Sequence, residues 1–227
     1  MCRRVLICLS LVAAAAPALA EGSDKLTQAV NIQFDYGLDV HRSDTIDSMD
    51  FGAAYRVAVS TFAGKAKDIG LGLRRDSSST TYTQTDSKVD VEWTDMVVGY
   101  RIFWFFPMIM LGSGSFNASL DGVDVVDSVL LTSGGGLSTR VPAGAIATAV
   151  ADIMYVDSSA TRDSTGSTVR IGQRTDVDLG VIVRLPWDNF DIYTGYRYRT
   201  YRVNIDGSGK GELETGPYLG FNLGFSP

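Results

Sequence analysis

The 227-residue sequence contains few of the residue types on which many active sites depend: it has one histidine and two cysteines. Both cysteines, Cys2 and Cys8, lie within the first twenty residues, which we predict to be removed. Long apolar runs are also missing from the rest of the chain. Residues 96–111 are the most apolar stretch, but Arg101 and Pro107 interrupt it and it is shorter than the roughly 20 residues that a spanning helix needs. We therefore expect no disulfide, no cysteine chemistry and no transmembrane helix.

Residues 1–20 have the pattern of a cleaved signal peptide. Arg3 and Arg4 form its basic start, residues 5–16 its apolar core, and Ala18 and Ala20 a small-x-small cleavage site. The apolar core is too short for an uncleaved membrane anchor. No linker or low-complexity tract divides the mature chain, so we predict that residues 21–227 form one domain.

Basic residues are fewer than acidic ones, 20 against 26, which gives a formal net charge of −6. The signal peptide carries two basic residues and no acidic one, so the predicted mature chain has a net charge of −8. Nucleic acid is not an expected partner, because phosphate binding needs a basic face. With one histidine and no cysteine in the mature chain, we also expect no metal site and no cofactor.

Apolar and polar residues alternate over residues 30–41, where Phe34, Tyr36 and Leu38 face one way and Asp35 and Gly37 the other. A period of two over this length is typical of a β-strand. The pattern recurs near residues 51–59, 68–74, 95–102, 176–185 and 218–225, and more weakly at 106–118, 124–141, 145–157 and 190–203. We count about ten strands, with eight or twelve as alternatives, and predict an all-β fold.

Alternation also fits a soluble β-sandwich, but three features favour a closed antiparallel transmembrane β-barrel. The first is the length of the connections. Short turns are predicted at residues 63–65, 105–107, 142–144 and 186–189, and longer polar loops at 41–50, 77–87, 158–167 and 204–211. Outer-membrane barrels combine short periplasmic turns with longer external loops.

The second feature is an aromatic girdle beside the short turns, which suits a lipid–water interface. Its predicted members are Phe62, Trp104, Phe106, Trp187, Phe190 and Phe225. The third feature is a polar strand face with charges of both signs, which would be costly to bury in a sandwich but fits a barrel lumen. The predicted lumen-lining charges are Asp35, Asp39, Arg56, Asp95, Arg101, Asp178, Arg184, Arg197 and Glu214.

The C-terminal stretch, residues 216–225, resembles the closing strand of outer-membrane barrels. The resemblance rests on Gly216, Tyr218, Phe221, Leu223 and Phe225, although the chain continues two residues past the last aromatic. It implies that the barrel-assembly machinery reads this strand. In size and layout the mature chain resembles small barrels of the outer membrane protein A, X and W kind, which implies a bacterial outer membrane as its location and lipid as its surroundings.

The charged lumen has two interpretations, a narrow passive pore for small solutes or ions, or a filled lumen in a barrel with a structural or surface role. We favour the second. A rival hypothesis is a rim-located lipid-modifying enzyme that uses His41 with Ser43, Asp44 or Asp47. No hydrolase motif accompanies these residues, so we expect no enzyme activity. A secreted ligand-binding β-sandwich is the third alternative.

Overall fold

The computed structural model describes residues 30–43, 49–63, 69–82, 87–120, 123–159, 161–162, 168–186, 190–205 and 208–225, so the predicted signal peptide lies outside the described residues. Its strands are β1 (Val30–Ser43), β2 (Met49–Ala63), β3 (Ile69–Tyr82), β4 (Ser87–Tyr100), β5 (Phe105–Leu120), β6 (Val123–Pro142), β7 (Ala147–Ser158), β8 (Thr161–Arg162), β9 (Thr168–Arg184), β10 (Phe190–Ile205) and β11 (Ser208–Phe225). Across these ranges, no helix is long and apolar enough to cross a membrane.

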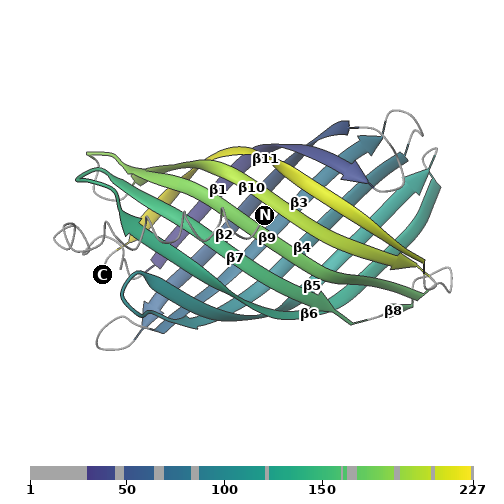
Figure 1. The fold of residues 1–227 in the computed structure, drawn as a ribbon, viewed down its shortest axis with the longest axis horizontal. Coiled ribbons are helices and arrows are strands. Elements are labelled where there is room, and N and C mark those ends of the chain that lie inside the picture. Colours follow the sequence, from purple (N-terminus) through teal and green to yellow (C-terminus); the bar gives the residue numbers. More distant parts are fainter. Residues whose placement is uncertain are drawn as a thin grey trace, which may run out of the picture.

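One antiparallel sheet closes on itself to form a barrel (Figure 1). The closing pair is β11 with β1, from Val30 opposite Phe225 to Ser43 opposite Glu212. Strand β8 is two residues long and pairs with β9 beyond the end of β7, so ten strands make up the wall. The predicted barrel of about ten strands is therefore confirmed, and the sandwich alternative is wrong.

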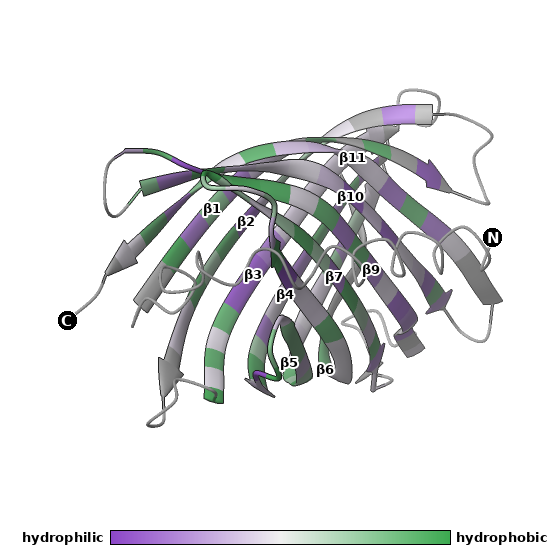
Figure 2. Cartoon of the chain, turned by 60° about the vertical axis from the view of Figure 1, so that its left-hand side comes forward, coloured by the Kyte–Doolittle hydropathy of each residue, from purple (hydrophilic) through white to green (hydrophobic). Residues whose placement is uncertain are grey.

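The period of two in the sequence becomes an inner and an outer face of each strand, because successive side chains of a strand point to opposite sides. In β10, Tyr193, Arg197 and Tyr201 are buried, whereas Tyr196 and Tyr198 on the other face are exposed. Figure 2 shows the alternation of hydrophilic and hydrophobic residues along the strands. Many charged residues thus point inward and many apolar ones outward, the reverse of a soluble protein.

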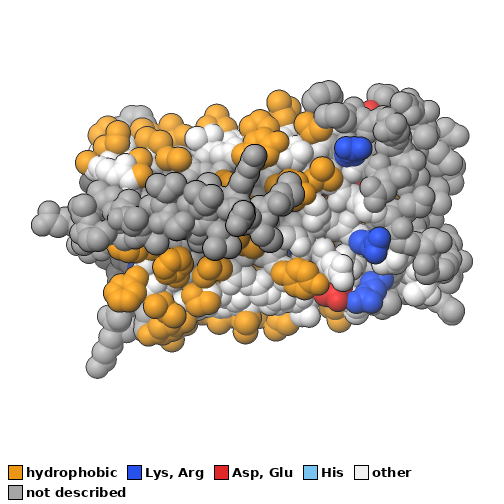
Figure 3. All heavy atoms as spheres, viewed as in Figure 1, with side chains coloured by type: hydrophobic (Ala, Val, Ile, Leu, Met, Phe, Trp, Pro, Cys, Tyr) orange, Lys and Arg blue, Asp and Glu red, His pale blue; other side chains and the backbone are white. Residues whose placement is uncertain are grey.

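The outer surface is divided along the barrel axis (Figure 3). Exposed apolar side chains such as Leu71, Ile109 and Leu219 cover the part toward connections 64–68, 101–104, 143–146 and 185–189, which we call the aromatic end. Toward the opposite end, which we call the polar end, exposed ion pairs replace them: Arg75 with Glu92, at 2.7 Å, and others. Such a division fits a barrel that stands in a bilayer at one end and in water at the other.

The predicted long loops at residues 77–87 and 204–211 are wrong, because most of these residues belong to strands. Strand β3 continues to Tyr82 and β4 begins at Ser87, while β10 ends at Ile205 and β11 begins at Ser208. Their Ser, Thr and Gly content suggested loops, but hydrogen bonding between strands requires no apolar residue. The barrel wall therefore extends past the apolar band as polar strands.

The turn predicted at residues 105–107 lies two residues earlier. Ile102 and Phe105 exchange backbone hydrogen bonds of 2.8 and 2.9 Å, which makes Phe103 and Trp104 the turn residues. Pro107 lies within β5, beyond the last residue of β5 that pairs with β4, which is Met108. Proline is tolerated at that position because no partner strand on that side needs its missing N–H.

Candidate functional site: the charged lumen

Strand alternation places a cluster of charged side chains inside the barrel, which we call the ion-pair network. Its members are Arg56, Arg74, Arg174, Arg197 and Arg199 with Asp35, Asp76, Asp95, Asp176, Asp178 and Glu214. All are buried, with exposed fractions of at most 8%. Five cations against six anions leave the cluster close to neutral, which buried charges require because isolated ions are very costly to desolvate.

One part of the network joins β1, β2, β3, β9 and β10. Arg56 contacts Asp76 through Nε and Asp178 through Nη1, both at 2.5 Å. Arg197, on β10, contacts Asp178 through Nε at 3.0 Å and Asp35 on β1 through Nη2 at 2.8 Å. Asp178 therefore lies between two guanidinium groups, each of which also holds a second carboxylate.

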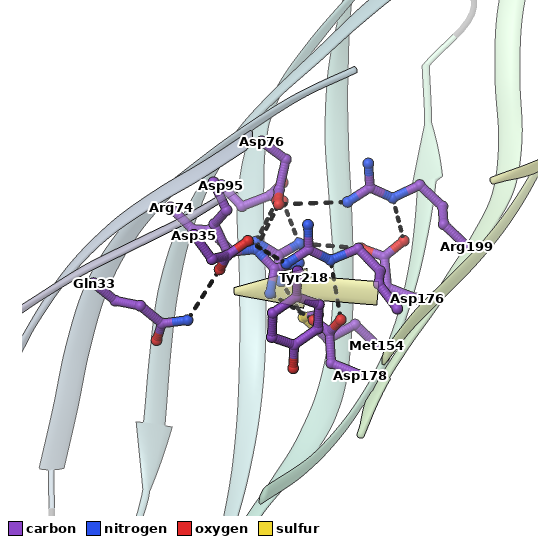
Figure 4. A network of polar contacts seen from close by, with 12 residues as sticks. Gln33, Asp35, Arg74, Asp76, Asp95, Met154, Asp176, Asp178, Arg199 and Tyr218 are labelled. Carbon is purple, nitrogen blue, oxygen red and sulfur yellow. Dashed lines mark hydrogen bonds and ion pairs between the residues drawn. The ribbon is translucent and has the colours of Figure 1, made fainter. Parts of the chain in front are cut away.

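Arg74 extends the network across the full width of the lumen (Figure 4). Its strand β3 and strand β9 are five strands apart in either direction around the barrel, so they lie opposite each other. Arg74 Nη2 is 3.1 Å from Asp176 on β9 and 3.2 Å from Asp95 on β4, while Nε is 2.7 Å from Asp76. Its Nη1 also donates to the Met154 sulfur at 2.7 Å. This one side chain thus bridges opposite walls.

Arg174 and Arg199 complete the network on its polar-end side. Arg174 contacts Asp95 at 2.7 Å, and Arg199 contacts Asp176 at 2.8 Å and Glu214 at 3.4 Å. Glu214 also accepts hydrogen bonds from Ser78 and Tyr201, both at 2.9 Å. The outermost carboxylate of the network therefore has both charged and neutral donors.

An apolar cluster fills the lumen next to the network, toward the polar end. Its buried members are Val91, Trp93, Phe116, Leu130, Tyr201 and Val203. The Trp93 ring meets Tyr201 edge-on at 6.2 Å, and the Arg174 guanidinium lies 4.4 Å from the Trp93 ring centroid. Gly114 leaves room for this ring, since a Cβ there would be 2.5 Å from it. The network and the cluster together form two successive layers across the lumen.

The lumen is hollow at the aromatic end. A cavity of about 490 Å³ lies there, and Arg56 and Arg74 of the network are among its lining residues. Arg101, Arg140 and Arg184 also line it. The barrel interior is thus open toward one end and filled in its middle.

The structure distributes eight of the nine predicted lumen-lining charges between two places. The network contains Asp35, Arg56, Asp95, Asp178, Arg197 and Glu214. Arg101 and Arg184 line the cavity instead. The side chain of Asp39 lies outside the described residues, as does that of His41, the candidate for a rim enzyme.

Five members of the network were not predicted as lumen-lining residues: Arg74, Asp76, Arg174, Asp176 and Arg199. The alternation gives a usable signal for each of them. Asp176 and Arg199 lie two residues from Asp178 and Arg197 on the same strand faces, and Arg74 ends the polar face of the alternation at residues 68–74, which Asp76 continues. Arg174 also lies on the inner face of β9 with Asp176 and Asp178 and pairs opposite the buried Val156, next to a backbone irregularity of this strand. Gln173 has a φ of 57°, and the pairing of β9 with β10 shifts register between Thr200 and Arg202.

The predicted aromatic girdle is partly visible. Phe190 stacks on Phe221 at 5.9 Å, and Phe221 lies 5.6 Å from Phe34, on the outer face of β10, β11 and β1. The prediction is wrong for Phe106, because this side chain faces inward and lines the cavity. The turn at Phe103 and Trp104 determines that Phe106 lies on the inner face of β5. Trp104 belongs to that turn. The side chains of Phe62, Trp187 and Phe225 lie outside the described residues.

Solved structures with this architecture are bacterial outer-membrane barrels. The chain is 13% identical to the β domain of the Bordetella autotransporter BrkA, with 87% of this chain and 100% of that one covered and a TM-score of 0.51. It is 9% identical to the outer membrane protease OmpT from Escherichia coli, covering 86% and 96%, with a TM-score of 0.50. No protein-family model matches the chain, and no curated protein sequence matches it. At these identities the likeness concerns the fold: the chain has the outer-membrane β-barrel fold.

Proposed function

We propose that this protein is an integral outer-membrane barrel with a structural or surface role, and that its lumen does not conduct ions. In this proposal residues 1–20 are removed after export, the aromatic end faces the periplasm and lipid surrounds the apolar band. The closing strand, through Gly216, Tyr218, Phe221, Leu223 and Phe225, is the part that the barrel-assembly machinery reads.

The observation that carries the proposal is the contact of Arg74 with Asp176 across the lumen, at 3.1 Å. A conducting path would have to separate these groups, and breaking a buried ion pair costs about 3–5 kcal/mol. The adjoining layer around Trp93 consists mainly of apolar and aromatic side chains, which replace the hydration of an ion poorly. A passive pore for small solutes or ions is therefore the less favoured of the two interpretations.

The proposal includes no enzyme activity. OmpT is named as a protease, but a likeness at 9% identity carries the fold and not the chemistry. Function on a shared fold depends on a specific site, and the charged groups of the ion-pair network are engaged with one another instead of with an approaching substrate.

Single-channel recording on the refolded protein in planar bilayers tests the proposal. We expect no discrete current steps from the wild type. The variant Arg74→Ser/Asp176→Ser/Trp93→Ala/Tyr201→Ala removes groups from both layers in a charge-neutral way and should give discrete steps. The matched control Arg75→Ser/Glu92→Ser removes an exposed pair on the outer wall and should stay closed.

Regular openings of the wild type under the same conditions would contradict the proposal and favour the passive pore. Heat-dependent gel migration checks that each variant has folded as a barrel before it is recorded. A variant that is folded but closed after loss of both layers would show that other groups fill the lumen.

A further inference from the structure

The cavity at the aromatic end has a size that suits a small molecule. Its volume of about 490 Å³ lies within the range of about 300–1,000 Å³ found for ligand pockets. Its inner end is bounded by Arg56 and Arg74, which are held in the ion-pair network. A molecule in this cavity would therefore have the ion-pair network as its floor.

The polar part of this cavity is rich in arginine. Arg101 follows β4, Arg140 lies on β6 and Arg184 on β9, so the three guanidinium groups come from well-separated parts of the wall. Two carboxylates, Asp152 and Asp191, also line it, which leaves an excess of one positive charge before the guanidinium groups of the floor are considered. Guanidinium groups are suited to hold carboxylate, sulfonate or phosphate oxygens through paired hydrogen bonds.

Polar capacity remains unused on one wall of the cavity. Thr148 and Asp152 lie four residues apart on the same face of β7. Thr148 is fully buried, and neither its hydroxyl nor the Asp152 Oδ1 atom has a hydrogen-bond partner among the described residues. Buried polar atoms are normally paired, so these two atoms retain hydrogen-bonding capacity on the cavity wall.

Part of the remaining wall is apolar. Phe106, Met108, Val97 and Ile182 line it beside the charged groups, and Met154 lies near the floor. A simple inorganic anion would leave this surface in contact with water. A molecule with an anionic head and an apolar body would cover both kinds of surface at once. Small-molecule pockets usually combine an apolar lining with a few polar groups that orient the ligand.

We propose that the aromatic-end cavity is a binding site for a small amphipathic anion, whose acidic group contacts Arg140 and its neighbouring arginines and whose apolar body packs on Phe106 and Met108. This inference goes beyond the proposed structural role and needs the network only as the floor of the pocket. Ligand binding and ion conduction are measured separately, so failure of one does not decide the other.

Calorimetric titration with 2-naphthoate is the test, on the whole chain refolded into nanodiscs of zwitterionic phosphatidylcholine. The wild type should bind it saturably with a ratio of one to one, and uncharged 2-naphthamide should bind at least tenfold more weakly. Loss of one charge-assisted contact typically changes affinity by about tenfold or more. Arg140→Gln should therefore weaken 2-naphthoate binding by about tenfold.

Two further variants separate a charge effect from general damage to the barrel. Asp152→Asn keeps the side-chain size but removes a negative charge from the same wall, so it should tighten 2-naphthoate binding severalfold. Arg75→Gln changes an exposed arginine on the outer wall and should leave binding unchanged. Changes in opposite directions at Arg140 and Asp152 are not expected from a merely structural role.

The acidic group could belong to a dissolved molecule or to a membrane lipid. Repeating the titration in nanodiscs that contain phosphatidylglycerol distinguishes these sources: unchanged affinity assigns the site to a dissolved anion, and a severalfold loss assigns it to an anionic headgroup that competes at the mouth. The inference is overturned if the wild type shows no saturable binding, if 2-naphthamide binds equally well, or if Arg140→Gln behaves like Arg75→Gln.

Discussion

At the scale of single residues, Asp176 shows how the network ties stability to charge balance. It is completely buried and contacts Arg74, Arg174 and Arg199 at 3.1, 3.5 and 2.8 Å. A carboxylate that contacts three guanidinium groups offsets the repulsion between them as well as the energetic cost of its own desolvation. Its charge therefore matters more than its volume.

We predict that Asp176→Asn lowers the free energy of unfolding by about 3–5 kcal/mol, because it leaves three buried cations without a shared partner. Urea unfolding of the refolded barrel in lipid vesicles measures the change. Asp157→Asn, which removes the carboxylate of an exposed pair with Arg170, is the matched control and should cost less than about 1 kcal/mol. Equal losses from the two variants would show that charge balance in the lumen does not limit stability.

Some residues of this site could be predicted from the sequence. Alternation placed Asp35, Arg56, Asp178 and Arg197 on the polar strand face, and the structure brings these four together. Their partners could not be read from the sequence, because contacts such as that of Arg74 with Asp176 join strands on opposite walls. Which residues meet there depends on the strand number and on the register with which the barrel closes.

At the scale of elements, the fold could be predicted because a strand needs little more than a period of two. The weak segments predicted near residues 124–141 and 145–157 correspond to β6 and β7. The polar strand ends could not be separated from loops in the same way. Residues 77–82 are rich in Ser and Thr, which suits both an exposed loop and a strand whose outer face is in water.

The glycines of β5 and β6 illustrate how elements share space inside the barrel. Gly112, Gly114, Gly134 and Gly136 leave the inner wall flat at the level where Trp93 and Met154 extend into the lumen. Large side chains on one wall are thus accommodated by the absence of side chains on another. The triple-glycine stretch at residues 134–136 has this packing role within a strand.

We predict that Gly114→Ala destabilises the barrel by about 1–3 kcal/mol, the usual cost of overpacking, because the new methyl group would meet the Trp93 ring. The control is Gly72→Ala, whose Cβ would lie at an ordinary 3.4 Å from the Val59 carbonyl oxygen and should cost much less. Urea unfolding followed by gel migration compares the two. A smaller loss at Gly114 than at Gly72 would mean that the Trp93 layer yields easily and does not seal the lumen.

At the scale of the whole molecule, the division of the outer surface defines an orientation. The apolar band, with the Phe34, Phe221 and Phe190 stack, lies toward the aromatic end, while the exposed pairs of Arg75 with Glu92 and Arg170 with Asp157 lie toward the polar end. Polar strands that extend beyond a bilayer belong on the side where the barrel projects into water. The lengths of the connections do not distinguish the ends, because only two residues separate β10 from β11 at the polar end, whereas five separate β2 from β3 at the aromatic end.

We predict that the polar end faces the cell exterior, which single cysteines can report because Cys2 and Cys8 both fall in the predicted signal peptide. Thr81→Cys, exposed at the end of β3, should react with a membrane-impermeant maleimide on intact cells. Ala145→Cys, exposed in the connection between β6 and β7 at the aromatic end, should react only after the outer membrane is opened. Because the two sites are similarly exposed in the barrel, a difference between them reports the membrane and not the local structure. The reverse labelling pattern would invert the barrel and place the arginine-rich cavity at the cell surface, where its anionic ligand would have to come from the medium.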